Sequence, residues 1–349
     1  MGWKDMNILV AGGAGYIGSH AVKALARAGF HPVTLDDGST GHPELVRWGD
    51  VVTADLAGSD ALPSLLREYD IRGVMHFAGR SLVAESHGRP DLYYRVNIAG
   101  TLKLLEAMVA ARVGLLLYSS SAAIYGVPPK NPISEDTSCL PISPYGETKL
   151  AAERMIEWYG RAYGLKAVSL RYFNAAGADP EGDLGEWHEP ETHLIPRLVT
   201  GALNGRCDCE VYGTDYPTPD GTCIRDFIHV SDLADAHVLA LRGLLHDGPT
   251  GAFNLGTGRG HSVLEVVDAV LRAFPQVQAR VVKTARRPGD PPVLVADPSR
   301  FATHFDWRPR RSDLDTVIKT AAGWAEKMGR GKCPADAAQR RRDGPADPR

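Results

Sequence analysis

Residues 7–18 read NILVAGGAGYIG, and this stretch decides the fold. An apolar run is followed by Gly12, Gly15 and Gly18, spaced three residues apart, and then by an amphipathic stretch to about Ala28. In a strand–turn–helix unit such glycines allow a tight turn, close approach of a pyrophosphate and close packing of the helix on a sheet. The start of the helix adds free amides and a positive dipole end for the phosphates. The stretch therefore predicts a dinucleotide-binding turn.

Apolar runs and amphipathic stretches alternate through the first half of the chain. Strands are predicted at residues 7–10, 33–35, 51–54, 74–77, 115–118 and 167–170, and long helices at about 91–111 and 145–163. This alternation is typical of a parallel sheet covered by helices. We therefore expect an α/β fold, with a Rossmann-type doubly wound parallel sheet that binds the dinucleotide in residues 1–174.

The second part of the chain is less regular. Residues 175–330 predict a smaller C-terminal α/β lobe for a substrate, and the division leaves open that some of its segments return to the first domain. Residues 331–349 are rich in Ala, Asp, Arg and Pro, with little to bury, and predict a disordered tail.

Composition excludes several classes of protein. The chain has 349 residues, 44% of them hydrophobic, and a formal net charge of -3, which argues against binding to nucleic acid or to an anionic membrane. No signal peptide and no bilayer-spanning apolar run is recognised. The five cysteines fit neither a zinc site nor a disulfide framework, so we expect a cytoplasmic protein with reduced thiols and without a metal site. The segment from Cys207 to Cys209 is expected to be a polar loop.

An acidic residue follows the second predicted strand at the distance expected for recognition of a ribose. Asp36 lies where a carboxylate bonds the adenosine hydroxyls and repels a 2′-phosphate, so NAD is favoured over NADP. Asp55 could bracket the adenine together with Leu56, although a helix cap explains this aspartate equally well. The predicted cofactor site comprises Gly12, Gly15, Tyr16, Ile17, Gly18, Asp36, Asp55, Leu56, Phe77, Ala78, Gly79, Asn97, Ser119, Tyr145, Lys149 and Tyr172.

Tyr145 and Lys149 lie one helical turn apart, downstream of a serine cluster that ends a predicted strand. A tyrosine hydroxyl titrates at about pH 10, and bringing it to about pH 7 requires roughly 4 kcal/mol of phenolate stabilisation. The lysine ammonium and an oxidised nicotinamide carry the right charges for that, and Ser121 can pass the proton. Alone, this spacing also fits a surface Tyr and Lys on an ordinary helix. Together with the glycine turn it predicts a catalytic set of Ser121, Tyr145 and Lys149.

Several longer segments accompany these residues. They are SSSAAIYG at 119–126, SPYGETK at 143–149, RYFN at 171–174, ETHLIP at 191–196, YGTDYP at 212–217 and IRDFIHV at 224–230. In this order they resemble the extended short-chain dehydrogenase/reductase family, whose members include NAD-dependent epimerases and dehydratases. The resemblance runs from about residue 7 to about residue 329, and is strongest to nucleotide-sugar 4-epimerases.

The resemblance implies that the chain interconverts UDP-galactose and UDP-glucose with tightly bound NAD. Tyr145, through Ser121, would take the proton of the 4-hydroxyl while the C4 hydride passes to NAD. The 4-keto sugar would then turn about its pyrophosphate and receive the hydride on its other face. Lys149 would hold the nicotinamide ribose.

The resemblance also implies which residues bind the substrate. Arg225 and Arg287 would meet the phosphates, Tyr212 would stack near the uracil, and Asp290 would bind the uridine ribose. For the arginines, surface salt bridges are the alternative, and His193 could equally be a structural histidine. The implied substrate site comprises Ser121, Tyr145, Asn174, His193, Leu194, Tyr212, Arg225, Arg287, Asp290 and Leu294.

The same scaffold also carries other activities. A 4,6-dehydratase needs an Asp-Glu pair where this chain has Ala122 and Ala123. Leu294 leaves more room than a tyrosine, so a 4-epimerase of UDP-N-acetylglucosamine, or of a UDP-pentose such as UDP-xylose or UDP-arabinose, stays open. A non-catalytic dinucleotide sensor is disfavoured because the serine, tyrosine and lysine are all present.

The resemblance implies a homodimer formed through the helices at 91–111 and 145–163.

Overall fold

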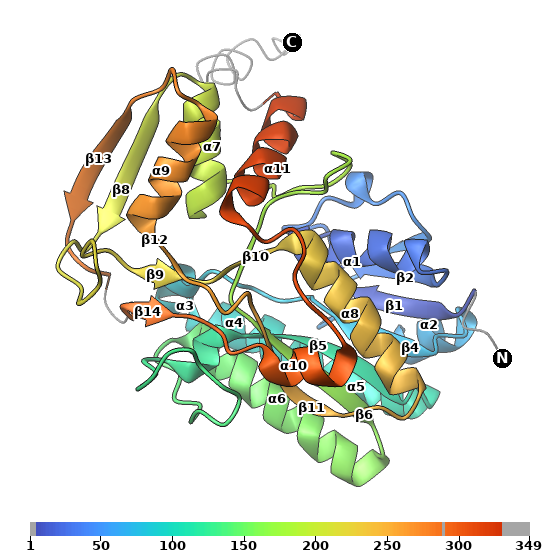
Figure 1. Ribbon diagram of the computed structural model, residues 1–349. Helices are drawn as coiled ribbons and strands as arrows, with labels where there is room; N and C mark the ends of the chain where they lie inside the picture. Colours follow the sequence, from blue (N-terminus) through green and yellow to red (C-terminus); the bar gives the residue numbers. More distant parts are fainter. Residues whose placement is uncertain (1–4, 288–289, 330–349) are drawn as a thin grey trace, which may run out of the picture.

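The computed structural model describes residues 5–287 and 290–329, and its centre is a parallel β-sheet (Figure 1). Within the described residues the sheet has seven strands in the order β11-β6-β5-β4-β1-β2-β3. These strands are β1 (Asn7–Ala11), β2 (His31–Asp36), β3 (Asp50–Thr53), β4 (Gly73–His76), β5 (Leu115–Ser121), β6 (Lys166–Tyr172) and β11 (Gly251–Leu255). All of their pairings are parallel. The expected Rossmann-type doubly wound sheet is confirmed, and the predicted strands are present with ends that differ by a few residues.

Helices cover both faces of the sheet because the strands bury alternate residues on opposite sides. Ile8 and Val10 belong to the core under one face, and Leu9 and Ala11 to the core under the other. The first face carries α1 (Tyr16–Arg27), α8 (Val230–Leu245) and α10 (Ser299–Phe305), and the second carries α2 (Leu62–Glu68), α5 (Gly100–Ala111) and α6 (Pro144–Tyr163). The result is a three-layer domain to which α8, β11 and α10 return from the later part of the chain.

A second, smaller lobe packs around its own apolar core (Figure 1). Its helices are α7 (Leu194–Leu203), α9 (Val263–Ala273) and α11 (Leu314–Lys327), beside the parallel pair β8 (Cys207–Tyr212) and β13 (Ala279–Thr284). Short strands join the lobes: β7 (Asn174–Ala176) pairs with β10 (Phe227–His229), and β9 (Ile224–Arg225) lies between β12 (His261–Ser262) and β14 (Val293–Leu294). The strand β8 corrects the polar loop expected at Cys207–Cys209, since both cysteines are buried with polar residues alternating outward.

The helix predicted at 91–111 is broken into three consecutive helical forms. The segment comprises α4 (Pro90–Tyr93), a π-helical stretch η2 (Tyr94–Ala99) and α5. A π-helical stretch re-aims side chains relative to a regular helix and recurs at functional sites. Here it carries Asn97, a predicted cofactor residue, into the buried interior. Periodicity does not reveal it, because one wider turn leaves the apolar pattern almost unchanged.

The described cysteines are reduced, and the described helices are short or polar. The cysteines Cys139, Cys207, Cys209 and Cys223 are free thiols there, while Cys333 and the tail predicted at 331–349 lie outside the described residues. In residues 5–287 and 290–329 no helix is long and apolar enough to cross a membrane.

Leu117→Ala is expected to destabilise the fold through a cavity. Leu117 lies on β5 and is 0% exposed within the core under α1 and α8. Truncating such a leucine costs about 2–5 kcal/mol, because the removed atoms lose burial and the surroundings relax only partly. Urea denaturation followed by circular dichroism measures the loss. Leu140→Ala, at a side chain that is 69% exposed, is the matched control. Its free energy of unfolding should stay within about 0.5 kcal/mol of that of the unsubstituted protein. Equal losses of stability in both variants would contradict the assignment of Leu117 to the core.

Candidate functional site

The glycine turn between β1 and α1 is shaped for a phosphate. Gly12 has φ +78°, and a Cβ there would lie 2.4 Å from the backbone N of Ala78; a Cβ on Gly18 would lie 2.1 Å from the carbonyl oxygen of Gly12. These two glycines are required by the packing of the chain itself. Gly15 is not, because its Cβ would meet nothing closer than 3.4 Å, yet it stands at the N-cap of α1 with no side-chain cap. The helix thus begins with open amides and without a side chain in the way, which fits a pyrophosphate.

Asp36 is joined to this turn by hydrogen bonds. Its Oδ2 accepts from the backbone N of Ala14 at 3.0 Å, and its Oδ1 accepts from Gly38 at 2.9 Å. Burial raises the pKa of the Asp36 carboxyl, and these two hydrogen bonds oppose the rise. By contrast Asp55 is exposed and accepts from the backbone N of Ala57 at 2.9 Å within a turn. The helix cap considered for Asp55 is wrong, because the next helix, α2, begins at Leu62 and has Ala61 as its N-cap.

The loop after β4 meets the π-helical stretch and α6 at one glycine. A Cβ on Gly79 would lie 2.9 Å from Oδ1 of Asn97 and 3.9 Å from Nζ of Lys149. Asn97 is fixed by accepting from the backbone N of Arg80 at 2.8 Å and by donating to Oγ1 of Thr148 at 3.0 Å. The structure therefore brings together Gly79, Asn97 and Lys149, which the sequence placed in one cofactor site from three distant segments.

Helix α6 presents the predicted tyrosine and lysine on its buried face. Ser143 caps the helix by accepting from the backbone N of Gly146 at 3.1 Å, and Pro144 occupies its first turn. Tyr145 is 8% exposed and Lys149 5% exposed. Ser121 ends β5 and is hydrogen-bonded to Tyr145.

Lys149 is held against the end of β5. Its ammonium donates to the carbonyl oxygen of Ser119 at 2.7 Å and lies 6.0 Å from the ring centre of Tyr145. Burial lowers the pKa of Lys149 to about 8, while the nearby Glu153 opposes that shift. Two of its three N–H donors remain for another partner.

Within the chain itself, the lysine does not lower the pKa of Tyr145. Burial raises this pKa, and only the hydrogen bond with Ser121 acts in the opposite direction. The physical reason is that the phenol is desolvated while the Lys149 ammonium is directed at a backbone carbonyl. Within the chain alone Tyr145 is therefore a proton donor, and a further positive charge is needed to make it a base.

A buried ion pair behind the catalytic residues was not predicted. Arg171 donates from Nη2 and Nε to Glu153 at 2.6 Å and 3.0 Å, and the hydroxyl of Ser120 donates to the same carboxylate. Arg171 also donates to the hydroxyl of Tyr125 at 3.0 Å, which in turn donates to Asn254 on β11 at 2.7 Å. The sequence did offer an indication of a buried carboxylate, because Glu153 follows Lys149 by one helical turn and so lies on the same buried face of the helix.

The residues expected to bind substrate fall into separate groups. Arg225 forms an ion pair with Asp290, and Arg287 lies 3.8 Å above the ring of Tyr212. Leu294 pairs in register with Arg225 and packs on the small apolar cluster around Ala122, Ile124 and Leu150, next in the chain to Ser121 and Lys149.

The other three expected substrate residues lie at the boundary between the lobes. Asn174 is exposed at the start of β7, where its backbone N donates to Asp226 at 3.0 Å. Leu194 is the first residue of α7, and His193 is its N-cap.

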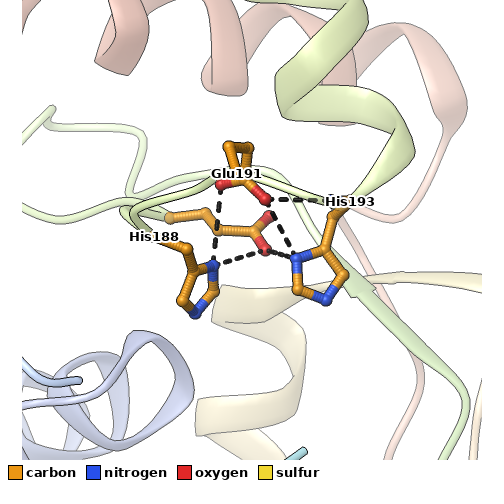
Figure 2. Close-up of side chains that lie close together, drawn as sticks. His188, Glu191 and His193 are labelled. Carbon is orange, nitrogen blue, oxygen red and sulfur yellow. Dashed lines mark hydrogen bonds and ion pairs between the residues drawn. The ribbon is translucent and has the colours of Figure 1, made fainter. Parts of the chain in front are cut away.

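His193 belongs to a cluster whose other members the sequence analysis missed. Its Nδ1 lies 2.8 Å from Glu186 and 3.1 Å from Glu191, and His188 completes the group (Figure 2). Burial acts to lower the pKa of both histidines, but the two carboxylates outweigh it and raise the pKa of His188 to about 9 and of His193 to about 10. The spacing Glu-x-His-x-x-Glu-x-His at residues 186–193 is the sequence feature that could have indicated this cluster.

Comparisons with known proteins point to one family. Residues 8–256 match the model of the NAD dependent epimerase/dehydratase family. The chain is 45% identical over 328 residues to the UDP-glucose 4-epimerase of Rhizobium meliloti (strain 1021), covering 94% of this chain and 99% of that protein. Identity to the UDP-glucose 4-epimerase of Lactobacillus helveticus is 43% over 327 residues, covering 93% and 99%. The crystal structure of UDP-glucose 4-epimerase from Brucella ovis in complex with NAD matches with a TM-score of 0.87 at 51% identity, covering 91% of this chain and 97% of that one.

Lys149→Met is expected to change how stability depends on pH. Because the folded pKa is about 8 and the ordinary value is 10.5, the unfolded chain holds more protons than the folded chain between these values. The stability of the unsubstituted protein therefore rises with pH in this window, whereas the variant lacks this contribution. The variant's free energy of unfolding, relative to the unsubstituted protein, should fall by about 2 kcal/mol between about pH 7 and about pH 9.5.

Urea denaturation of both proteins at the two pH values measures this difference. Lys103→Met, at a surface lysine paired with Asp60, controls for the general effect of removing a lysine. A difference between Lys149→Met and the unsubstituted protein that stays constant over this pH range would show that the Lys149 ammonium is not buried as described.

Proposed function

The chain belongs to the NAD dependent epimerase/dehydratase family, and we propose that it is a UDP-glucose 4-epimerase that interconverts UDP-galactose and UDP-glucose. The observation that carries the proposal is the convergence of Ser121, Tyr145 and Lys149 at the end of β5, beside the loop that packs on the glycine turn. The similarity to UDP-glucose 4-epimerases over nearly the whole chain supports the same activity.

Tyr145 and Ser121 move the proton of the sugar 4-hydroxyl. NAD, when bound, supplies a positively charged hydride acceptor that can also return the hydride to the same carbon. That positive charge opposes the effect of burial on Tyr145, so the phenol can accept the proton through Ser121 and later give it back. Lys149 keeps one N–H on Ser119 and uses another for the ribose beside the nicotinamide. Inversion also requires the 4-keto sugar to turn about its pyrophosphate, so that the hydride returns to its other face.

The chain's own residues fit NAD as the group held at the turn. The start of α1 after Gly15, which has no side-chain cap, suits the pyrophosphate, and Asp36, fixed on Ala14, suits the adenosine ribose. Asn97 holds the loop of Gly79 against α6 on the nicotinamide side. We assign the remaining cofactor contacts to Gly12, Tyr16, Ile17, Gly18, Asp55, Leu56, Phe77, Ala78, Ser119 and Tyr172.

The nucleotide, rather than the sugar, is the part that the second lobe holds. Arg287, stacked on Tyr212, and Arg225, paired with Asp290, offer cations and a carboxylate for the diphosphate and the uridine ribose. Arg225 would exchange part of its ion pair for a phosphate. We assign the remaining substrate contacts to Asn174, His193, Leu194 and Leu294.

Exposed apolar side chains favour a homodimer formed through the face of α5 and α6. Leu102 and Val109 on α5, and Trp158 and Tyr163 on α6, are between 36% and 64% exposed, and these two helices pack on the same core. Such a patch on adjacent helices suits an interface between two copies.

A cytoplasmic location is part of the proposal, and the free thiols support it.

Sugars with an N-acetyl group are a second candidate class of substrate. Leu294 is half-buried against the apolar cluster beside Ser121, and its side chain is smaller than a tyrosine. Room at this position suits UDP-N-acetylglucosamine, and a UDP-pentose, lacking C6, would also fit.

Tyr145→Phe is expected to abolish epimerisation and to leave NAD bound. Loss of a positioned acid–base group lowers kcat by about 10²–10⁴-fold, whereas the phenyl ring keeps its packing in the site. Conversion of UDP-galactose to UDP-glucose by purified protein without added cofactor measures activity, and absorbance after denaturation measures the NAD released. Tyr159→Phe, a half-buried tyrosine on the same helix, is the control. A Tyr145→Phe variant with near-normal kcat would contradict the assigned role.

Leu294→Tyr is expected to discriminate against N-acetylated substrates. The added ring occupies the room assigned to the acetamido group, so kcat/KM for UDP-N-acetylglucosamine should fall at least about tenfold relative to that for UDP-galactose. Parallel assays of both substrates with the unsubstituted protein and the variant measure the ratio. An unsubstituted protein that does not convert UDP-N-acetylglucosamine would remove this candidate substrate.

A further inference from the structure

Two histidines and two glutamates converge in the segment between β7 and α7. Figure 2 shows Nδ1 of His188 and Nδ1 of His193 both directed at carboxylate oxygens between them. The carboxylates belong to Glu186 and Glu191, and one ligand atom from each of the four residues lies within 4.8 Å of the others. From this convergence we infer that the four residues form a site for one divalent metal ion of the zinc class.

The contacts between the histidines and the carboxylates are close in length to the edges of a tetrahedral site. Zinc holds nitrogen and carboxylate ligands at about 2.0–2.2 Å, which places neighbouring ligands of a tetrahedron about 3.3–3.6 Å apart. Nδ1 of His188 lies 3.3 Å from Oε1 of Glu186 and 3.6 Å from Oε2 of Glu191. Nδ1 of His193 lies 2.8 Å from Oε1 of Glu186 and 3.1 Å from Oε1 of Glu191. The two histidines thus contact different oxygens of Glu191, and this carboxylate would turn to direct one oxygen at the ion.

Two of these atoms lack a partner of hydrogen-bonding geometry. Nδ1 of His188 and Oε2 of Glu191 are buried, and neither makes a hydrogen bond with any described residue. The side chain of Glu186 is 8% exposed, so its charge is also removed from water. Buried polar atoms without partners cost free energy. An ion at the centre would coordinate these atoms.

A second carboxylate cluster in this chain already contains a cation of its own. Asp179, Glu181 and Asp183 converge on Nζ of Lys23, at 2.6, 3.0 and 2.7 Å. There a lysine ammonium from α1 supplies the cation. At the cluster of Glu186, among the described residues, the groups facing the carboxylates are the imidazoles of His188 and His193 rather than a lysine or arginine. A metal ion would displace the protons of these imidazoles when it binds.

The segment that carries the cluster is anchored at several points. The ring of Trp187 stacks on His42 at 4.0 Å, and Nε1 of Trp324 donates to the carbonyl oxygen of Glu186 at 3.1 Å. The backbone N of His193 donates to Oε1 of Glu191 at 2.9 Å. Anchored ligands reduce the entropy lost on binding and hold a geometry in place.

The ligand set selects among metals. Two imidazoles and two carboxylates suit Zn²⁺ and its neighbours, whereas Ca²⁺ and Mg²⁺ prefer oxygen ligands throughout. An ion held here would tie the segment to the start of α7, because His193 is the N-cap of that helix. Ligation through Nδ1 would also leave Nε2 of His193 as a fixed N–H donor.

Cobalt titration of chelator-treated protein, without NAD or UDP-sugar, tests the site. Co²⁺ replaces zinc and absorbs strongly in the visible only when its coordination is tetrahedral, and thiolate ligation would show separately in the near ultraviolet. The unsubstituted protein should develop the visible band to saturation at one equivalent, without thiolate absorption. His188→Gln and Glu191→Gln should each weaken binding at least about 100-fold, the upper end of what losing a supporting hydrogen bond costs.

Matched controls separate this site from surface binding. His87→Gln removes an exposed histidine and Glu181→Gln alters the lysine-filled cluster, and both variants should bind Co²⁺ as the unsubstituted protein does. Zn²⁺ should raise the melting temperature of the unsubstituted protein and of both controls but not of folded His188→Gln.

Absence of one-equivalent binding in the unsubstituted protein would overturn the inference and leave a cluster held together by protons. Binding that survives in both His188→Gln and Glu191→Gln would overturn it as well, since the ion would then lie elsewhere. The measurement involves no turnover, so its failure is distinct from failure of the proposed epimerase activity.

Discussion

The buried ion pair between Glu153 and Arg171 is the interaction on which the catalytic geometry depends. It fastens α6, which carries the tyrosine and lysine, to β6, while the hydroxyl of Ser120 ties β5 to the same carboxylate. Removing one partner of a buried pair leaves an uncompensated charge and costs about 3–5 kcal/mol. The pair therefore sets the position of Lys149 and Tyr145 relative to Ser121 more firmly than any contact among those three residues.

Burial then sets the protonation states in the site. It lowers the pKa of Lys149 and raises that of Tyr145, so both groups are displaced toward their neutral forms. A positive cofactor charge beside the phenol acts against this displacement. In the proposed mechanism Tyr145 becomes a base when the oxidised cofactor is present, which couples proton transfer to hydride transfer. The same proposal requires the second lobe only to hold the nucleotide, through the pairs Arg225–Asp290 and Arg287–Tyr212.

The sequence predicted those features that depend on local patterns. The glycine turn, the strand ending in Asp36 and the helix predicted at 145–163 each have a local physical cause, and the structure contains all three. The features it missed depend on contacts between distant segments. The π-helical turn at Asn97, the buried partner of Arg171 and the cluster around Glu186 each require knowing which segments face one another. No metal site was expected, because metal binding was judged from the spacing of the cysteines. The ligands proposed here are instead histidines and glutamates within one loop.

The central claim is that the hydrogen at C4 leaves the sugar and returns to it as a hydride. UDP-galactose carrying deuterium on C4, incubated with the purified protein in ordinary water, tests this most directly. Mass spectrometry of the UDP-glucose formed should find the deuterium retained at C4, because a hydride held on the cofactor does not exchange with solvent. Loss of the deuterium to water would contradict the account and would indicate removal of the C4 hydrogen as a proton instead.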